Sequence, residues 1–165
     1  MFDKIISVLE DQAIAKNTKR IKEILEFRRI LEPEIAALAA ASLDPDDLVL
    51  IKTILDRQEK SLAEDKGDAH DDLHFHLTLA RATKNEILVE VVAILHDILK
   101  ECRVPPLENL TRKRISLQGH QQIYAALIER DSESSRKAML NHLSEVDSLL
   151  YGQRTDTFQE PPSSP

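Results

Sequence analysis

Apolar residues recur at steps of three and four positions along most of the chain, and capping or turn residues separate the runs. This spacing places apolar side chains on one face of an α-helix, whereas a half-buried strand would alternate at every second residue. The pattern predicts six main helices and a shorter leading helix, over residues 2–14, 18–42, 45–62, 68–83, 86–102, 108–130 and 132–150.

The predicted boundaries rest on residues that begin or end helices. Asn17-Thr18 offers a break after the leading helix and a new N-cap. Asp44 and Pro45 give a strong start signal, because the carboxylate can cap free backbone N–H groups and proline fits the first helical position. Pro33 is expected to kink or split its helix, and Pro105-Pro106 to end the helix before them.

Composition agrees with an all-α fold, since 42% of the residues are apolar, 31% are charged and only three are glycine. Short connections between long helices favour antiparallel neighbours, so we predict an antiparallel bundle of six to seven helices. The run over 86–102 is apolar nearly all round and is expected to lie centrally. We assign residues 1–17 to the leading helix and linker, 18–151 to the helical domain, and 152–165 to a disordered tail.

Charge and cysteine content exclude several classes of function. The formal net charge is -7 and acidic and basic residues are interspersed, so the chain lacks the basic stripe that binds nucleic acid. The single Cys102 suits a reducing compartment. We find no signal-peptide pattern and no uninterrupted apolar run of membrane-spanning length. These features predict a soluble cytoplasmic protein that does not enter a membrane.

Three histidines fall on predicted interior faces of three different helices. His76 shares its face with apolar neighbours and with Asp72 one turn earlier, while His120 and His142 each lie among apolar residues of their own helices. A single buried histidine is usually a hydrogen-bonded core residue. Three imidazoles and a carboxylate that converge need compensation for lost solvation, and a divalent metal would supply it.

Other polar residues in the pattern permit more than one interpretation. Arg28 takes an apolar position in the middle of the stripe over 18–42, so it either pairs with a core carboxylate, reaches solvent, or binds the carboxylate of a small ligand. His70 and His74 share an acidic face that is expected to be solvated.

The stretch DLHFHLTLARATKNEIL resembles the DxxFHxxLxxAxxN signature of FadR C-terminal (FCD) domains, which are effector-binding domains of GntR-family transcription regulators. Upstream, EFRRILEPEIAALAA is similar to the ExRxxLExxxAxxAA opening of that family. His120 and His142 follow His76 at separations of 44 and then 22 residues, in the same order as in the family. The resemblance spans about residues 20 to 150.

The resemblance implies a helical bundle whose central cavity holds a divalent metal, such as Zn, Ni, Co or Mn, on Asp72, His76, His120 and His142. It also implies a small organic acid as effector, with Arg28 and Asn85 near the ligand. Family members are expected to act as homodimers and to bind DNA through an N-terminal winged helix-turn-helix domain. We find no such domain before residue 17, so this chain is expected to be the sensing part, and not an enzyme.

Two alternatives remain at this point. His96-Asp97 in an all-α chain is a weak indication of an HD-type metal-dependent phosphohydrolase. A scaffold or co-repressor that binds no ligand would use the acidic surface to contact a partner. Inward polar residues count against a scaffold, because a bundle that binds nothing would have no reason to bury them.

Overall fold

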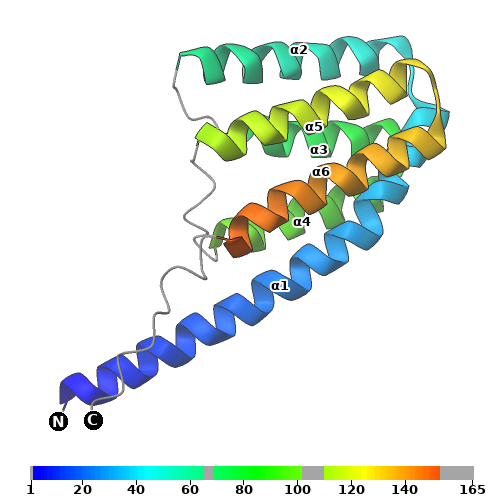
Figure 1. Ribbon diagram of the computed structural model, residues 1–165. Helices are drawn as coiled ribbons and strands as arrows, with labels where there is room; N and C mark the ends of the chain where they lie inside the picture. The colour runs from blue at the N-terminus through cyan, green and yellow to red at the C-terminus, as the bar shows by residue number, and fades with distance from the viewer. Residues whose placement is uncertain (1, 65–68, 102–109, 153–165) are drawn as a thin grey trace.

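A computed structural model describes residues 2–64, 69–101 and 110–152 and shows six helices and no strand within these ranges. The helices are α1 (Phe2–Ser42), α2 (Pro45–Ala63), α3 (Ala69–Ala82), α4 (Glu86–Glu101), α5 (Leu110–Ile128) and α6 (Ser132–Gly152) (Figure 1). The all-α prediction is therefore confirmed. The expectations for Cys102, Pro105-Pro106 and the tail from residue 153 onwards lie outside the described residues.

Helix α1 is continuous over 41 residues, so the predicted break at Asn17-Thr18 is wrong. Asn and Thr disfavour a helix interior by only a few tenths of a kcal/mol each, roughly, and good helix formers flank them. Pro33 also lies inside α1 and does not divide it. The helix continues through Pro33 because buried side chains on both sides of it, among them Leu25 and Ile35, anchor both halves to the bundle.

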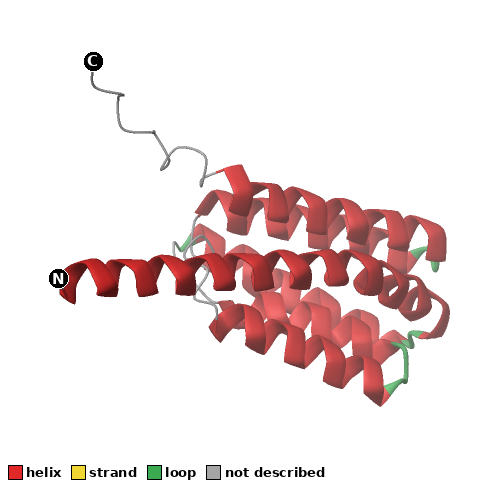
Figure 2. Ribbon diagram, turned by 90° about the horizontal axis from the view of Figure 1, so that it is seen from below, coloured by secondary structure: helices red, strands yellow, loops and turns green. Residues whose placement is uncertain are grey.

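The helices run side by side in the bundle, and α1 extends beyond it at the N-terminal end (Figures 1 and 2). Helix α6 packs against α1 and α5, α2 against α5 and α3, and α4 against α3 and α1. Short turns join α3 to α4 and α5 to α6, and each of these pairs is antiparallel. Lys84 and Arg130, in the two turns, have positive φ angles of 59° and 53°, which close the helices before them.

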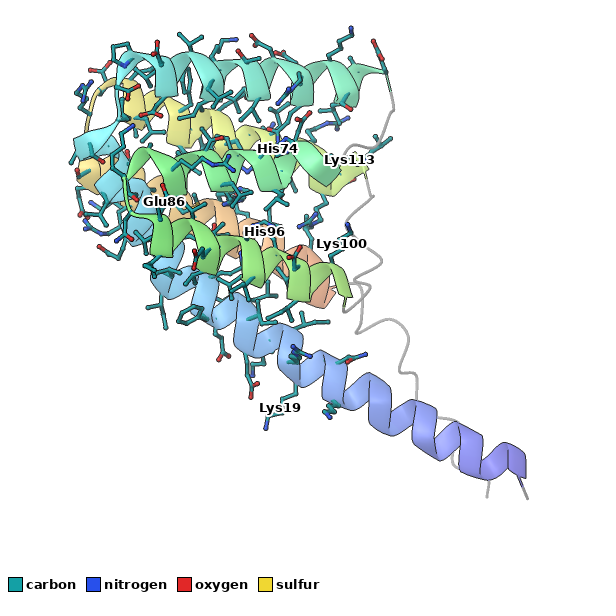
Figure 3. The ribbon with its side chains drawn as sticks, turned by 180° about the vertical axis from the view of Figure 1, so that it is seen from behind. Lys19, His74, Glu86, His96, Lys100 and Lys113 are labelled. Carbon is teal, nitrogen blue, oxygen red and sulfur yellow. The ribbon has the colours of Figure 1, made fainter. Side chains whose placement is uncertain are left out.

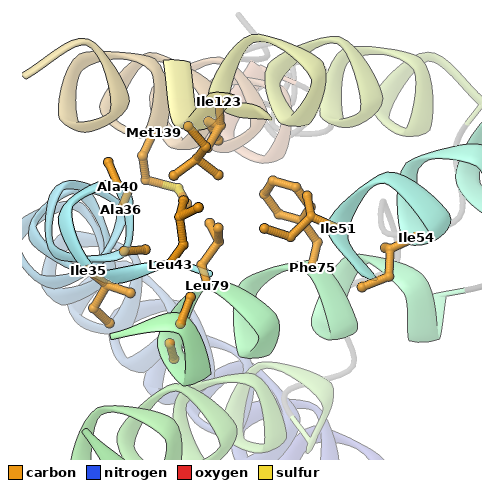
Figure 4. Close-up of a cluster of buried hydrophobic side chains, with 14 of the residues drawn as sticks. Ile35, Ala36, Ala40, Leu43, Ile51, Ile54, Phe75, Leu79, Ile123 and Met139 are labelled. Atoms are coloured by element: carbon orange, nitrogen blue, oxygen red, sulfur yellow. The ribbon is translucent and has the colours of Figure 1, made fainter. Parts of the chain in front are cut away.

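One buried apolar cluster joins all six described helices, with Phe75 and Ile123 among its fully buried members (Figure 4). The predicted stripe of α1 is confirmed at Ile21, Ile24 and Ile35, although Leu38 is 52% exposed. The central position predicted for residues 86–102 is wrong. Helix α4 lies beside α1 and α3 and leaves two of its apolar side chains, Ile87 and Ile94, exposed.

The N-cap predicted at Asp44 is confirmed, and this residue forms a capping box with Asp47 at the start of α2. The Asp44 side chain accepts from the Asp47 backbone N–H, and the Asp47 side chain accepts from the backbone N–H of Asp44. Lys84 donates to both carboxylates at 2.9 Å and so ties the end of α3 to the start of α2. Among the described helices, none is both long and apolar enough to cross a membrane.

Candidate metal centre

The three histidines predicted to point inward meet inside the bundle. His76 comes from α3, His120 from α5 and His142 from α6, and one ring nitrogen of each lies within 4.8 Å of the others. Their exposed fractions are 1%, 0% and 2%. The prediction that three helices bring these imidazoles together is confirmed.

Several nitrogens of this cluster lack hydrogen-bond partners. Both ring nitrogens of His76, Nε2 of His120 and Nδ1 of His142 are buried and make no hydrogen bond to a described residue, although Nδ1 of His76 lies 2.5 Å from a carboxylate oxygen of Glu32. The other nitrogen of His120, Nδ1, lies 3.0 Å from Oε1 of Gln58. Because an amide oxygen can only accept, Nδ1 of His120 carries the proton and Nε2 presents its lone pair to the cluster.

Asp72 lies beside the three rings. Its Oδ1 is 3.7 Å from Nε2 of His120 and accepts a 2.7 Å hydrogen bond from the Ser116 hydroxyl. The side chain is 28% exposed, so the carboxylate lies at the edge of the buried cluster. Although burial raises the pKa of Asp72, its electrostatic interactions with His120, His76 and Arg112 outweigh that effect and hold the pKa well below its ordinary value. The carboxylate is therefore an anionic oxygen donor next to three nitrogen donors.

Gly119 permits the close approach of α5 to α6 on which the cluster depends. A Cβ atom at this position would lie 2.4 Å from Nδ1 of His142, 2.8 Å from its Cβ and 2.9 Å from its Cγ. Contacts this short are repulsive. The absence of a side chain at Gly119 therefore brings His142 within reach of the neighbouring His120.

The sequence interpretation missed Glu32, which is 1% exposed and lies between Arg28 and His76. Its Oε1 is 2.5 Å from Nε of Arg28 and its Oε2 is 2.5 Å from Nδ1 of His76, the second contact lying outside hydrogen-bond geometry. Although burial raises the pKa of Glu32, the charges of Arg28 and His76 lower it well below its ordinary value. Of the readings open for Arg28, the structure shows the pair with a core carboxylate. A signal was available, since Glu32 follows Arg28 by four residues on one helix.

His96 also belongs to this region. Its ring centroid lies 5.3 Å from that of His76, and Glu32, His76 and His96 form a second group whose ligand atoms lie within 4.8 Å of one another. Figure 3 labels His96 on α4. The next residue, Asp97, is exposed. The adjacent His96-Asp97 pair of the phosphohydrolase alternative therefore does not form a single site.

Asn85 does not lie at the cluster. It is exposed, and its side chain accepts from the backbone N–H of Ile87 at the start of α4. His96 is 11 residues further along, or roughly 16 Å at 1.5 Å per helical residue. The expectation that Asn85 lies near a ligand is thus not supported, because the helix start uses its side chain as a cap. His74 is exposed next to Asp71, as predicted, while the side chain of His70 lies outside the described residues.

Burial keeps the rings of His96, His120 and His142 neutral. It lowers the pKa of His142 and that of His96 to about 3, with the charges of Arg28 and His76 acting in the same direction. Burial and the neighbouring His142 also lower the pKa of His120 well below its ordinary value. Neutral imidazole is the form that binds a metal, so these side chains present lone pairs at neutral pH. The unpaired nitrogens and the adjacent carboxylate fit a divalent ion that takes nitrogen and oxygen ligands.

Acid should destabilise the metal-free chain well before its carboxylates titrate. Unfolded histidine takes up a proton near its ordinary pKa of 6.5, whereas His142 and His96 resist protonation down to about 3 when folded. The unfolded state therefore gains protons first as pH falls. Between pH 7 and 5 we expect each histidine to lower the free energy of unfolding by about 2 kcal/mol. Urea titrations in EDTA at the two pH values measure this change.

Asp147 should offset part of that loss. Burial raises its pKa to about 6, so the folded state takes up this proton between about pH 6 and 4 and gains stability as pH falls. The variant His96→Leu should have a shallower pH dependence than the wild type, and Asp147→Asn a steeper one. Equal stability at pH 7 and pH 5 in the wild type would show that the buried rings are not held neutral.

The fold and this centre together define a class of protein domain, an all-α bundle that buries a cluster of imidazoles beside carboxylates. A profile of the FCD domain family matches residues 23–145, which is most of the chain. The chain therefore belongs to the FCD domain family, whose members are the effector-sensing domains of GntR-family transcription regulators.

Known relatives support this assignment. The chain is 33% identical over 143 residues to the Uxu operon transcriptional regulator of Escherichia coli K12, covering 78% of this chain and 52% of that protein. It is 30% identical over 152 residues to the HTH-type transcriptional regulator LutR of Bacillus subtilis, covering 89% and 69%. It also resembles the structure of Streptococcus agalactiae GntR, with a TM-score of 0.67, 26% identity, and coverage of 80% and 60%. The chain spans about half the length of the Uxu regulators that it matches.

Proposed function

We propose that this chain senses a small organic acid through a divalent metal bound by His76, His120, His142 and Asp72, and thereby modulates DNA binding by a winged-helix domain. The observation that carries the proposal is the set of buried, unpaired imidazole nitrogens within 4.8 Å of one another. Desolvating polar groups without partners costs several kcal/mol, roughly, and a metal ion would remove that cost.

A metal held by this set would supply a Lewis acid to which a carboxylate effector can bind. The chain's own residues would hold the donors in place. Gln58 fixes the tautomer of His120, Ser116 orients Asp72, and Glu32 contacts Nδ1 of His76. Arg28 then has a positioning role, because it holds Glu32 against His76.

Effector binding would act on DNA through the helices that carry the ligands. His76, His120 and His142 lie on three different helices, so a ligand that draws the donors together favours one packing of α3, α5 and α6 over another. A coupling free energy of about 1 to 3 kcal/mol would change operator affinity some 5- to 150-fold. The names of the relatives, regulators of operons and regulons, agree with such a role.

Equilibrium dialysis with Zn²⁺, Ni²⁺, Co²⁺ or Mn²⁺, followed by elemental analysis, tests the proposal. We expect about one ion per chain in the wild type. Asp72→Asn keeps the size of the side chain and an acceptor for Ser116, but it removes the charge. We expect it to weaken metal affinity by about 10- to 100-fold.

Asp97→Asn is the matched control, because Asp97 is exposed and not part of the cluster. It should leave metal affinity unchanged. A thermal-shift screen of small carboxylates on the same samples should detect effectors only when metal is present. Binding of no divalent ion, or equal affinity in Asp72→Asn and Asp97→Asn, would refute the metal centre.

A further inference from the structure

Arg112 is a buried arginine to which the proposed metal centre assigns no role. It lies in the first turn of α5, and the residue is only 8% exposed. Its Nε atom is buried and has no hydrogen-bond partner in the part of the chain that the structure describes. An arginine is seldom buried unless a carboxylate or another acceptor satisfies it.

The neighbouring arginines are satisfied. Arg28 pairs with Glu32 at 2.5 Å, and Arg29 pairs with Asp147 at 2.8 Å. No such ion pair joins Arg112 to a described residue. Arg112 is therefore the buried guanidinium of this region with donor capacity left over, whereas Arg28 is already engaged.

The position of Arg112 places it near the metal centre. Ser116 follows it by four residues and His120 by eight, so the three share one face of α5. Ser116 donates to Asp72, which lies beside His120. Burial lowers the pKa of Arg112, while the charge of Asp72 raises it, so these two side chains are close enough to interact.

The charge balance of the region favours an anion of charge two. The buried Asp71 nearby is paired with Arg57. Among the described residues the region also holds three guanidinium groups and three carboxylates, so these fixed charges cancel. These are Arg28, Arg29, Arg112, Glu32, Asp72 and Asp147. A divalent ion would leave two positive charges in excess, and an excess charge is costly in a buried site.

We propose that Arg112 binds the second carboxylate of a dicarboxylate effector whose first carboxylate lies at the metal centre. This inference rests on the proposed function, since it assumes the metal. The guanidinium presents donors in a planar fork that matches a carboxylate, and such charge-assisted pairs are among the stronger hydrogen bonds. The chain therefore selects dianionic acids over monoanionic acids of the same length.

Calorimetry on the metal-loaded full chain tests the selection. The probes are dicarboxylates of three to six carbons, among them succinate and malate, and monocarboxylates of the same lengths. We expect at least one dicarboxylate to bind about 10- to 100-fold more tightly than its monocarboxylate counterpart. Arg112→Gln should remove that advantage and leave monocarboxylate affinity within about threefold, since a charge-assisted bond is lost only for the second carboxylate.

Arg114→Gln is the matched control, because Arg114 is exposed on the same helix, and it should retain the selection. Arg112→Lys keeps the charge but not the fork, so its affinity should fall between those of the wild type and Arg112→Gln. Metal content is measured on every sample. Absence of metal from the wild type would refute the proposed function. If the wild type binds metal but does not prefer dicarboxylates, this inference alone is overturned. The same holds if the preference survives in Arg112→Gln.

Discussion

Gly119→Ala should destabilise the chain and weaken metal binding, although the same change in a helix interior ordinarily stabilises by about 1 kcal/mol. The added methyl group would meet His142 at 2.4 to 2.9 Å, and two of the contacted atoms, Cβ and Cγ, lie close to the backbone of α6. Rotating the imidazole cannot relieve them, so α6 must move away from α5. We expect a loss of about 1 to 3 kcal/mol in unfolding free energy.

The displacement should also reduce metal affinity by about 10- to 100-fold, because His142 moves away from the other donors. Urea unfolding and metal titration measure the two effects. Gln118→Ala serves as control, because Gln118 is the exposed neighbour of Gly119 on α5 and should change neither quantity. A Gly119→Ala chain that is more stable than the wild type and binds metal normally would show that α5 and α6 are not held together at this point.

His142→Leu should separate folding from metal binding. The leucine fills similar volume and removes a buried nitrogen, Nδ1, that has no hydrogen-bond partner. The metal-free variant should therefore equal or exceed the wild type in stability, by up to about 1 kcal/mol. It should lose the stabilisation by metal, which for the wild type at 100 times Kd amounts to about 2.7 kcal/mol, or about 5 to 10 °C in melting temperature.

Thermal melts in EDTA and with saturating metal give both quantities for each chain. His74→Leu is the control, since His74 is exposed and its removal should leave the metal-dependent shift intact. A His142→Leu chain that still gains several degrees on metal addition would mean that the ion binds elsewhere. A large loss of stability in EDTA would instead mean that His142 is a structural core residue.

Much of the fold and part of the site could be predicted from the order of residues alone. The periodicity of apolar residues determines which face of each helix is buried, and His76, His120 and His142 lie on those faces. Their convergence needed one further step, that three buried faces of one small bundle share a single core. Asp72 followed from its place one turn before His76.

The partners of buried charges could not be predicted in the same way. Arg28 was visible as an anomaly on the stripe of α1, but the pattern could not decide between a ligand and Glu32 as its partner. Arg112 gave no signal, because its helix begins among polar residues and its burial depends on how α5 packs against neighbours distant in sequence. The role of Gly119 could not be predicted either, since it depends on the close approach of α6 to this position.

Tertiary packing also overrode two local signals. Asn17-Thr18 suggests a break and Pro33 a kink or a split, and α1 is neither broken at the first nor split at the second. Helix α4 looked central because it is apolar nearly all round, yet it leaves Ile94 exposed at the side of the bundle. Local propensities amount to about 1 to 3 kcal/mol, and the burial of several large side chains exceeds that sum.

X-ray absorption spectroscopy of the metal-loaded chain measures the coordination shell directly. Three imidazole nitrogens at roughly 2.0 to 2.1 Å and at least one oxygen donor are expected for Zn²⁺ bound to the wild type. A shell built from oxygen alone, or one with fewer than three imidazole nitrogens, would contradict a metal centre at His76, His120 and His142.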